Sequence, residues 1–408
     1  MDQPTDRDQP NPERRNPFED GGLLDESGVT RRKLLKMGGL GAGALALPGL
    51  IAACGGGGGG GTTSASGTDG GGGETSEDPE LTKLLDGITS KQVIIGNYGG
   101  DTEEVRRRVF WEPFEARTGC KVVSADAGSL AYPMLLGEIP PKWDAIHGST
   151  LEVATAEEFG KKPLPKTPEI AWEDLVVPEK YRDQQWQSFF TAYTYSAIEG
   201  TFDTEPTTWA DFFDTKKFPG KRAWPAEYFM GGVFEAALMA DGVPPDEVYP
   251  FDFERATAKI SSIFDDFVIY TEYAQAQSFL TSKTVSMSYA PNGLWFQLEA
   301  KGVPAKTIWD ATPIVNINGM NNIPDGPNPD AVEALAAWCK QPQLQAEFSR
   351  STNYGPGTSE AFDELTDEEV ENLPNAPQRT NIVEEDAAYI AKNYGTIEEE
   401  NQRVFAEA

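Results

Sequence analysis

Two short segments of the chain carry residue types that recognise charge, and each directly follows a stretch typical of a buried strand. They are Tyr98, Gly99, Gly100 and Asp101 in the first segment, and Asp126 and Ser129 in the second. Carboxylates accept charge-assisted hydrogen bonds from cationic groups, and an aromatic face attracts a cation. Glycines leave the N–H groups at the start of a following helix open to an anionic group. These residues predict a binding site for a small, polar, charged molecule.

An expected βαβ unit positions these two segments. Residues 92–98 include three consecutive β-branched side chains and predict a buried strand. We expect Asp101 to cap the following helix, with Glu104 completing a capping box, and Gly119 to end it. Residues 120–124 predict the second strand. The right-handed crossover makes the two strands parallel, and in such sheets ligands bind at the carboxyl ends of the strands.

The remainder of the chain alternates between helical and strand-like patterns, which predicts an α/β protein. Helical patterns cover residues 227–241, 253–264, 274–280 and 329–349, and strand-like runs cover residues 143–146, 192–198, 285–290 and 312–317. About 320 residues follow the glycine-rich region, which is enough for one large domain or two medium ones.

The N-terminal region predicts export and attachment to a membrane. Arg31 and Arg32 precede an apolar run, residues 37–53, as in a twin-arginine signal, and small residues precede Cys54 as in a lipobox. The run is shorter than the about 20 residues that a spanning helix needs. We therefore expect residues 1–53 to be a signal peptide, Cys54 to be lipidated, and residues 54–88 to be a glycine-rich tether. The protein would lie outside the cytoplasm, periplasmic or at the cell surface, anchored to the cell membrane.

Charge and cysteine content narrow the class of protein further. The chain carries a formal net charge of −31. This balance argues against nucleic acid as a partner and favours cationic ligands, although adaptation to a salty or extracellular milieu explains it equally well. Cys120 and Cys339 lie in apolar contexts. We expect them to be buried free thiols, although an exported protein permits a bridge.

Little in the sequence supports an enzyme. His147 is the single histidine, and no GxSxG motif is present to form a serine triad with it. One histidine cannot supply the HExxH type of metal spacing, so we predict no metal site and no cofactor. Paired carboxylates of a glycosidase remain open in so acidic a chain, and an exported hydrolase is therefore the less favoured alternative to a binding protein.

Six phrases carry a resemblance that spans nearly all of the chain after the tether. They are "GNYGGDTEEVRRRVFWEPFEARTG", "FPGKRA", "EAALMADGVPPDEVYPFDFERA", "AQAQSFLTSKTVSMSYAPNG", "IPDGPNPDAVEALAAW" and "YGPGTSEAF". In this order they resemble the spermidine/putrescine-type extracellular solute-binding proteins of ABC transporters. The resemblance implies a type II periplasmic-binding-protein fold, in which two α/β lobes joined by a hinge close over a ligand in the interlobe cleft. Lobe one would comprise residues 89–194 and 316–408, and lobe two residues 195–315.

The resemblance also implies a function and partners. A receptor of this kind is not an enzyme, needs no cofactor, acts as a monomer and passes a captured small molecule to an ABC transporter permease. The residues that we expect to bind the ligand, besides the two segments above, are Trp224, Glu227, Tyr228, Tyr270, Asn292 and Asn316.

Departures from the family pattern leave the ligand open. Ile269 and Tyr270 stand where the family commonly has a tryptophan pair, and Asn316 opens a segment where relatives often carry an acidic residue with glycine. These changes remove groups that recognise cations and add amides. The ligand is expected to be polyamine-like or amine-containing, and the alternatives are a zwitterion resembling an amino acid, a sugar, or ferric iron held by Tyr193 and Tyr195.

Overall fold

The computed structural model describes residues 78–166, 177, 179–182 and 184–407. These residues form a single compact unit. The predicted signal peptide, the twin arginines Arg31 and Arg32, the lipidation site Cys54 and residues 54–77 of the tether lie outside the described residues, and those predictions stand as made.

The described strands join in one mixed sheet of eleven strands. Its main path is β2 (Lys121–Asp126), β1 (Gln92–Asn97), β3 (Ala145–Ser149), β9 (Ile314–Asn322), β4 (Gln185–Ile198), β7 (Met287–Pro291), β5 (Arg222–Pro225) and β6 (Phe267–Tyr270). β8 (Ala305–Thr307) and β10 (Gly355–Pro356) pair with β4, and β11 (Val383–Glu384) pairs with β9. The pairs β1–β2, β1–β3, β5–β6 and β5–β7 are parallel, whereas β9 and β4 are antiparallel to their main-path neighbours.

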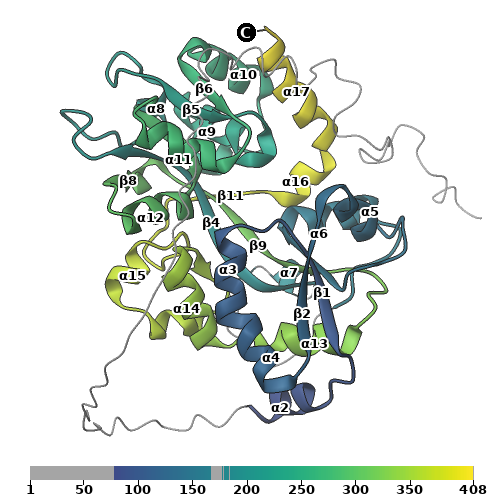
Figure 1. The fold of residues 1–408 in the computed structure, drawn as a ribbon. Helices are drawn as coiled ribbons and strands as arrows, with labels where there is room; N and C mark the ends of the chain where they lie inside the picture. Colours follow the sequence, from purple (N-terminus) through teal and green to yellow (C-terminus); the bar gives the residue numbers. More distant parts are fainter. Residues whose placement is uncertain (1–77, 167–176, 178, 183, 408) are drawn as a thin grey trace, which may run out of the picture. The chain divides into compact units, whose positions relative to one another are not determined.

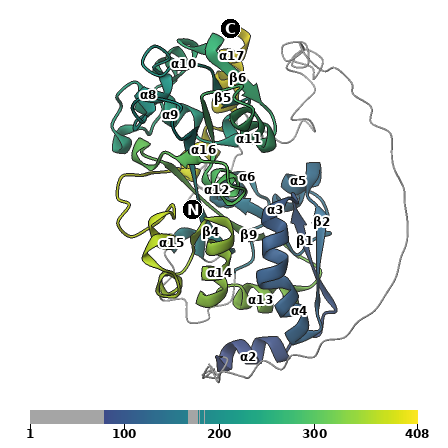
Figure 2. The ribbon, with the colours of Figure 1, turned by 60° about the vertical axis from the view of Figure 1, so that its left-hand side comes forward.

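Two groups of parallel strands are therefore joined through the long strands β4 and β9. Figures 1 and 2 show these two strands passing between the group that holds β1 and β2 and the group that holds β5 and β6. The arrangement is that of a type II periplasmic-binding-protein fold, with two α/β lobes connected by strands that cross between them.

Helices cover both parts of this sheet. Those among the described residues are α2 (Pro79–Asp86), α3 (Asp101–Arg106), α4 (Glu112–Thr118), α5 (Ala131–Leu135), α6 (Thr150–Phe159), α7 (Glu179–Arg182), α8 (Trp209–Phe213), α9 (Val233–Ala240), α10 (Phe253–Ser261), α11 (Tyr273–Thr281), α12 (Asn292–Ala300), α13 (Pro329–Trp338), α14 (Pro342–Thr352), α15 (Asp367–Glu371), α16 (Ala387–Lys392) and α17 (Tyr394–Glu407). A π-helical turn, η1 (Arg107–Trp111), joins α3 to α4, and short 3₁₀ turns, among them η3 (Tyr228–Met230), occupy several connections.

The predicted βαβ unit is confirmed, with one correction at the start of its helix. β1 and β2 are parallel, and α4 ends before Gly119, whose φ of 73° is left-handed as a C-terminal glycine requires. Asp101, however, is the first helical residue and makes no capping hydrogen bond, so the predicted capping box with Glu104 was wrong. Gly100 occupies the cap position instead, because its carbonyl accepts from the N–H groups of Glu103 and Glu104.

The predicted helical stretch 329–349 is two helices in the structure. α13 ends at Trp338 and α14 begins at Pro342. Proline has no N–H to donate and disfavours helical backbone in the residue before it, so the chain turns here and Pro342 becomes the first residue of α14. Sequence periodicity alone continued across this break because apolar residues recur on both sides of it.

The two ends of the described chain differ from the division into tether and lobes that the sequence predicts. Pro79–Asp86 form α2, capped by Asp78 and anchored by buried Leu81 and Leu85, although residues 78–88 were assigned to the tether. At the other end, α17 lies beside α10 (Figures 1 and 2), and its Ile397 and Val404 belong to the hydrophobic cluster of lobe two. The lobe boundaries themselves remain a prediction.

Both remaining cysteines are free and buried, as expected. Cys120 and Cys339 lie in the hydrophobic cluster that packs α2, η1 and α13 against β1. Burial raises the pKa of the Cys120 thiol to about 11, so this group is a thiol and not a thiolate at neutral pH.

Asp144 connects β1 to the start of α13 and provides a test of the fold. The side chain is 1% exposed and accepts hydrogen bonds from the N–H of Ile94 at 2.7 Å and of Asn328 at 2.6 Å. We expect Asp144→Ala to lower the free energy of unfolding by about 3 kcal/mol, because two partly buried N–H groups lose a charged acceptor. Urea unfolding measures this loss, and the exposed Asp363→Ala serves as control. If Asp144→Ala lowers the free energy of unfolding as little as Asp363→Ala does, Asp144 does not stabilise the fold in this way.

Candidate ligand-binding site

One face of the paired strands β4 and β9 carries a row of polar and aromatic side chains, which we call the β4–β9 row. It consists of Phe189, Thr191 and Tyr193 on β4 and Asn318 and Asn316 on β9, since Phe189 pairs with Asn318 and Thr191 with Asn316. The Asn318 amide donates to the Thr191 hydroxyl at 3.0 Å and to the Asn316 side-chain oxygen at 2.7 Å. These hydrogen bonds fix the side chains on a common face, as the two-residue period of strands requires.

A buried cation lies at one end of this row. The Arg106 guanidinium stacks over the Phe189 ring, with 5.1 Å between its carbon and the ring centroid. Arg106 is 1% exposed, and none of its three side-chain nitrogens has a hydrogen-bond partner. Burial lowers its pKa to about 10, so it remains charged at neutral pH. A buried charge without a partner is costly, and an anionic group would satisfy the donors of Arg106.

Aromatic side chains surround this cation. His147 and Tyr354 both stack on Phe189, at centroid distances of 6.1 and 5.2 Å, and the ring of Tyr98 meets His147 edge-on at 6.2 Å. Burial and the positive charge of Arg106 lower the pKa of His147 well below its usual value, so it is neutral at pH 7. The Nε2 atom of His147 is buried and has no hydrogen-bond partner. This end of the row is thus polar, aromatic and positively charged.

A carboxyl group lies at the other end. Glu385 directly follows β11 and accepts a hydrogen bond from the Asn316 amide. Its pKa is raised to about 8, first by burial and then by the nearby carboxylates of Glu235 and Glu152. The row therefore has a cationic group at one end and an acidic group at the other, connected by amides and a hydroxyl.

Two tyrosines, Tyr193 on β4 and Tyr273 on α11, interact beside the row. The hydroxyls of Tyr193 and Tyr273 share a hydrogen bond, and the Tyr273 hydroxyl donates to the carbonyl of Met230 at 3.1 Å. Burial raises the pKa of Tyr273, and the charges of Tyr354 and Glu385 act in the same direction. The site thus uses residues of α3, α11, β3, β4, β9 and the segment after β11.

Several predicted site residues lie at or next to this site. Asn316 is part of the row, and Tyr98, 58% exposed, contacts it through His147. Asp126, at the end of β2, is close enough to Tyr98 for its negative charge to help raise the pKa of the Tyr98 hydroxyl. Gly99 and Gly100 have φ of 74° and 79° and open space around them, which leaves room beside the α3 N-terminus. Three further predicted residues, Asp101, Ser129 and Glu227, are exposed.

Four other predicted residues are enclosed in the protein interior. Trp224 is 1% exposed and stacks on Phe267 at 4.9 Å. The buried hydroxyls of Tyr228 and Tyr270 donate to Glu235 and to the carbonyl of Tyr289, each at 2.8 Å. Asn292 is buried at the start of α12, where its side-chain oxygen accepts from the N–H of Ala192 at 3.0 Å. In the structure each of these four side chains is engaged in packing or in internal hydrogen bonds.

Sequence reasoning missed Arg106, Phe189, Tyr273, Tyr354 and Glu385. A signal for Arg106 was present, because it lies four residues before Phe110 and eight before Phe114, on the apolar face of its helix. An arginine at such a position needs a partner that the sequence does not show. No comparable signal marks Glu385, since it stands in an acidic run, and only the pairing of β11 with β9 brings it to Asn316.

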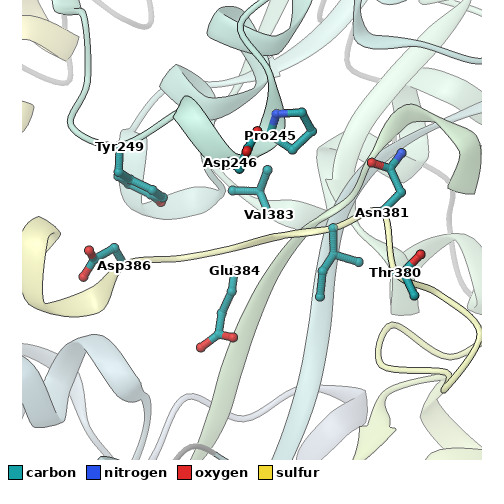
Figure 3. Close-up of a pocket in the computed structure, with 9 residues that line it drawn as sticks. Pro245, Asp246, Tyr249, Thr380, Asn381, Val383, Glu384 and Asp386 are labelled. Atoms are coloured by element: carbon teal, nitrogen blue, oxygen red, sulfur yellow. The ribbon is translucent and has the colours of Figure 1, made fainter.

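A separate open pocket of about 570 Å³ lies on the segment around β11. Figure 3 shows its lining, with Pro245 and Asp246 across from Val383, and with Tyr249 and Asp386 to one side. Glu385 does not line this pocket, although its neighbours Glu384 and Asp386 do.

The residues proposed for ferric iron have other contacts. The Tyr195 hydroxyl donates to the carbonyl of Thr208 at 2.8 Å, and Tyr193 is bound to Tyr273. Within residues 78–407, apart from the undescribed gaps, no group of three or more histidines, cysteines or acidic residues is placed to hold a metal ion.

Two lobes on one mixed sheet, joined by strands that cross between them, define a solute-binding protein of the type II periplasmic fold. The chain belongs to the bacterial extracellular solute-binding protein family, whose sequence model matches residues 152–378. The match covers more than half of the chain. It identifies the wider family and does not single out the spermidine/putrescine type.

Three similar proteins illustrate this relationship. The gamma-aminobutyric acid-binding protein of Pseudomonas aeruginosa is 25% identical over 297 residues, which cover 71% of this chain and 83% of that protein. The solved structure of the Atu4243 GABA receptor has a TM-score of 0.68 and 28% identity, and the match covers 77% of this chain and 97% of the receptor. An ABC transporter substrate-binding protein from Bradyrhizobium japonicum USDA 110 has a TM-score of 0.69 and 25% identity, covering 77% and 99% of the two chains.

The protein is therefore the solute-binding component of an ABC importer and captures a small polar solute outside the cytoplasm. Its relatives are binding proteins and not enzymes. Among the helices that the structure describes, none is long and apolar enough to cross a membrane.

Proposed function

We propose that the solute is a zwitterion resembling an amino acid, bound by its carboxylate at Arg106. The unpartnered guanidinium of Arg106 carries this proposal. A guanidinium presents two parallel N–H donors to a carboxylate, and such a pair is strong because both partners are charged. The ligand would supply the partner that the protein itself does not.

Two observations support a zwitterion over a simple anion. Glu385 and Tyr273 lie toward the opposite end of the β4–β9 row, where they can receive an ammonium group. In addition, two relatives at 25% and 28% identity are named as binding γ-aminobutyric acid, which carries one group of each charge.

A polyamine is the second candidate, favoured by the acidic residues Glu385 and Glu227 and by the resemblance in sequence. A dication, however, would lie next to Arg106, and like charges in a region of low dielectric repel strongly. The zwitterion satisfies both ends of the row, and a polyamine satisfies only one.

The proposal includes how the protein acts as a receptor. Ligand contacts from both lobes would shift an equilibrium between open and closed states, without catalysis, cofactor or metal. The proposal also includes twin-arginine export through Arg31 and Arg32 and lipidation at Cys54. The protein would act as a monomer and deliver its ligand to a permease. Sequence motifs support the export signal and the lipidation, and the family resemblance supports the monomer and the permease.

Thermal unfolding of the domain from residue 78 onward, with a panel of ligands, tests this function. We expect stabilisation by ω-amino acids or other amino-acid-like zwitterions, because a ligand at a hundredfold excess over its Kd adds about 2.7 kcal/mol. Putrescine and spermidine should give smaller shifts, and neutral sugars none. Stabilisation by polyamines alone would overturn the zwitterion and leave the receptor function intact.

A further inference from the structure

Glu385 stands in an unusual environment for a carboxyl group. It lies immediately after β11, which pairs with β9, and its donor in the structure is the amide of Asn316. An amide donor is weaker than a cation in stabilising a carboxylate. The ionised form of Glu385 therefore receives little direct stabilisation from the protein.

The charged and titratable groups around Glu385 all oppose its ionisation or are neutral at pH 7. The carboxylates are Glu235 on α9 and Glu152 on α6. The tyrosines in electrostatic range are Tyr193, Tyr228, Tyr249, Tyr273 and Tyr289, on β4, η3, the segment before α10, α11 and β7. None of these groups carries a positive charge. A carboxyl group among other carboxyl groups, with no cation beside it, stays protonated well above its usual range.

The β4 residue that Arg106 contacts differs from the one that lies opposite the partner of Glu385. Arg106 lies over Phe189, and Glu385 is held by Asn316, which pairs with Thr191, two residues further along β4. Residues two apart on a strand are separated by about 7 Å. This spacing favours a ligand whose two charges lie several bonds apart, as in an ω-amino acid and unlike an α-amino acid.

We propose that Glu385 is the residue that receives the cationic group of the ligand, and that it gives up its own proton to solvent as the ligand binds. The step is balanced: the neutral carboxyl group and the ammonium ligand become a carboxylate–ammonium pair, and one proton leaves to the buffer. Glu385 thereby selects ligands with an amine at the required distance. This inference rests on the proposed function in its choice of ω-amino acids, but the role of Glu385 extends to any amine-bearing ligand.

Isothermal titration of the unmodified protein with 4-aminobutyrate, at pH 7 in two buffers of different ionisation enthalpy, measures the proton. With a pKa of about 8, Glu385 is about 90% protonated at pH 7. We therefore expect release of close to one proton per ligand bound, falling toward none at pH 9. Binding of 4-aminobutyrate without proton release would overturn the role of Glu385 and leave the zwitterion function standing.

The variant Glu385→Gln adds a second readout, with Glu384→Gln as the matched control. Glu384 is the adjacent exposed residue and lies outside the site. Glu385→Gln should bind 4-aminobutyrate ten- to a hundredfold more weakly and release no proton, whereas Glu384→Gln should behave as the unmodified protein. Equal affinity in both variants would also overturn the proposal.

Putrescine separates the two hypotheses. If putrescine binds with proton release while 4-aminobutyrate does not bind, Glu385 keeps its role and the zwitterion function fails. If glycine binds as tightly as 4-aminobutyrate, the spacing argument fails. If neither amine binds at any pH tested, both proposals are overturned.

Discussion

Replacing Arg106 by methionine should raise the Kd for the zwitterionic ligand at least a hundredfold, about 3 kcal/mol, while it stabilises the ligand-free protein. Binding weakens because the carboxylate of the ligand loses its charged donors in a buried site. The free protein gains stability, by about 1–3 kcal/mol, because a buried guanidinium without a partner is replaced by an apolar side chain of similar length. Titration calorimetry with ligand and urea unfolding without ligand measure the two effects.

The opposite signs of these effects distinguish a ligand-binding arginine from a structural one. A structural arginine would lose stability on replacement, because its partners within the protein would be left unpaired. Arg108→Met is the matched control, since Arg108 lies on the same helical segment, is exposed and pairs with Glu347 at 3.0 Å. Affinity of Arg106→Met within threefold of the control would contradict the proposed carboxylate site.

The second large effect is expected at Trp224, which should contribute to the stability of the fold and not to ligand binding. Trp224 stacks on Phe267 at 4.9 Å and packs against Tyr289 and Phe213 at 5.3 and 5.6 Å. Trp224→Ala removes a large buried side chain and should lower the free energy of unfolding by about 3–5 kcal/mol. Urea unfolding followed by far-ultraviolet circular dichroism measures this loss.

The affinity for ligand distinguishes this core role from the contact that the sequence predicted. Trp224→Phe keeps most of the packing, so the variant should fold and bind with the affinity of the unmodified protein. If the Trp224→Phe protein has nearly unchanged stability but loses more than tenfold in affinity, Trp224 contacts the ligand as the sequence predicted.

Local sequence determined the first βαβ unit because every element of it is specified by neighbouring residues. The β-branched run at Val93 to Ile95 makes a buried strand, the apolar spacing of Phe110 and Phe114 makes one helix face, and Gly119 ends that helix. Family phrases likewise identified the solute-binding class, which the family model then confirmed. These inferences needed no contacts between distant segments.

Other features exceeded what local patterns can specify. The cap at Gly100 in place of Asp101 depends on backbone hydrogen bonds that either residue type permits. Trp224, Tyr228, Tyr270 and Asn292 had plausible types for a binding site, but side-chain type does not tell whether a residue faces a cleft or a core. That distinction follows from how the sheet of lobe two folds against its helices.

The sequence by itself determined an acidic α/β protein of the solute-binding class, with a charged loop after its first strand. Tertiary structure alone decided the site, because Arg106, Phe189, Asn316 and Glu385 are far apart along the chain. The antiparallel pairing of β4 with β9 puts Phe189 and Asn316 on one face, and the parallel pairing of β11 with β9 adds Glu385. Such pairings join segments that are distant in the sequence, so a local pattern does not specify which strands become neighbours.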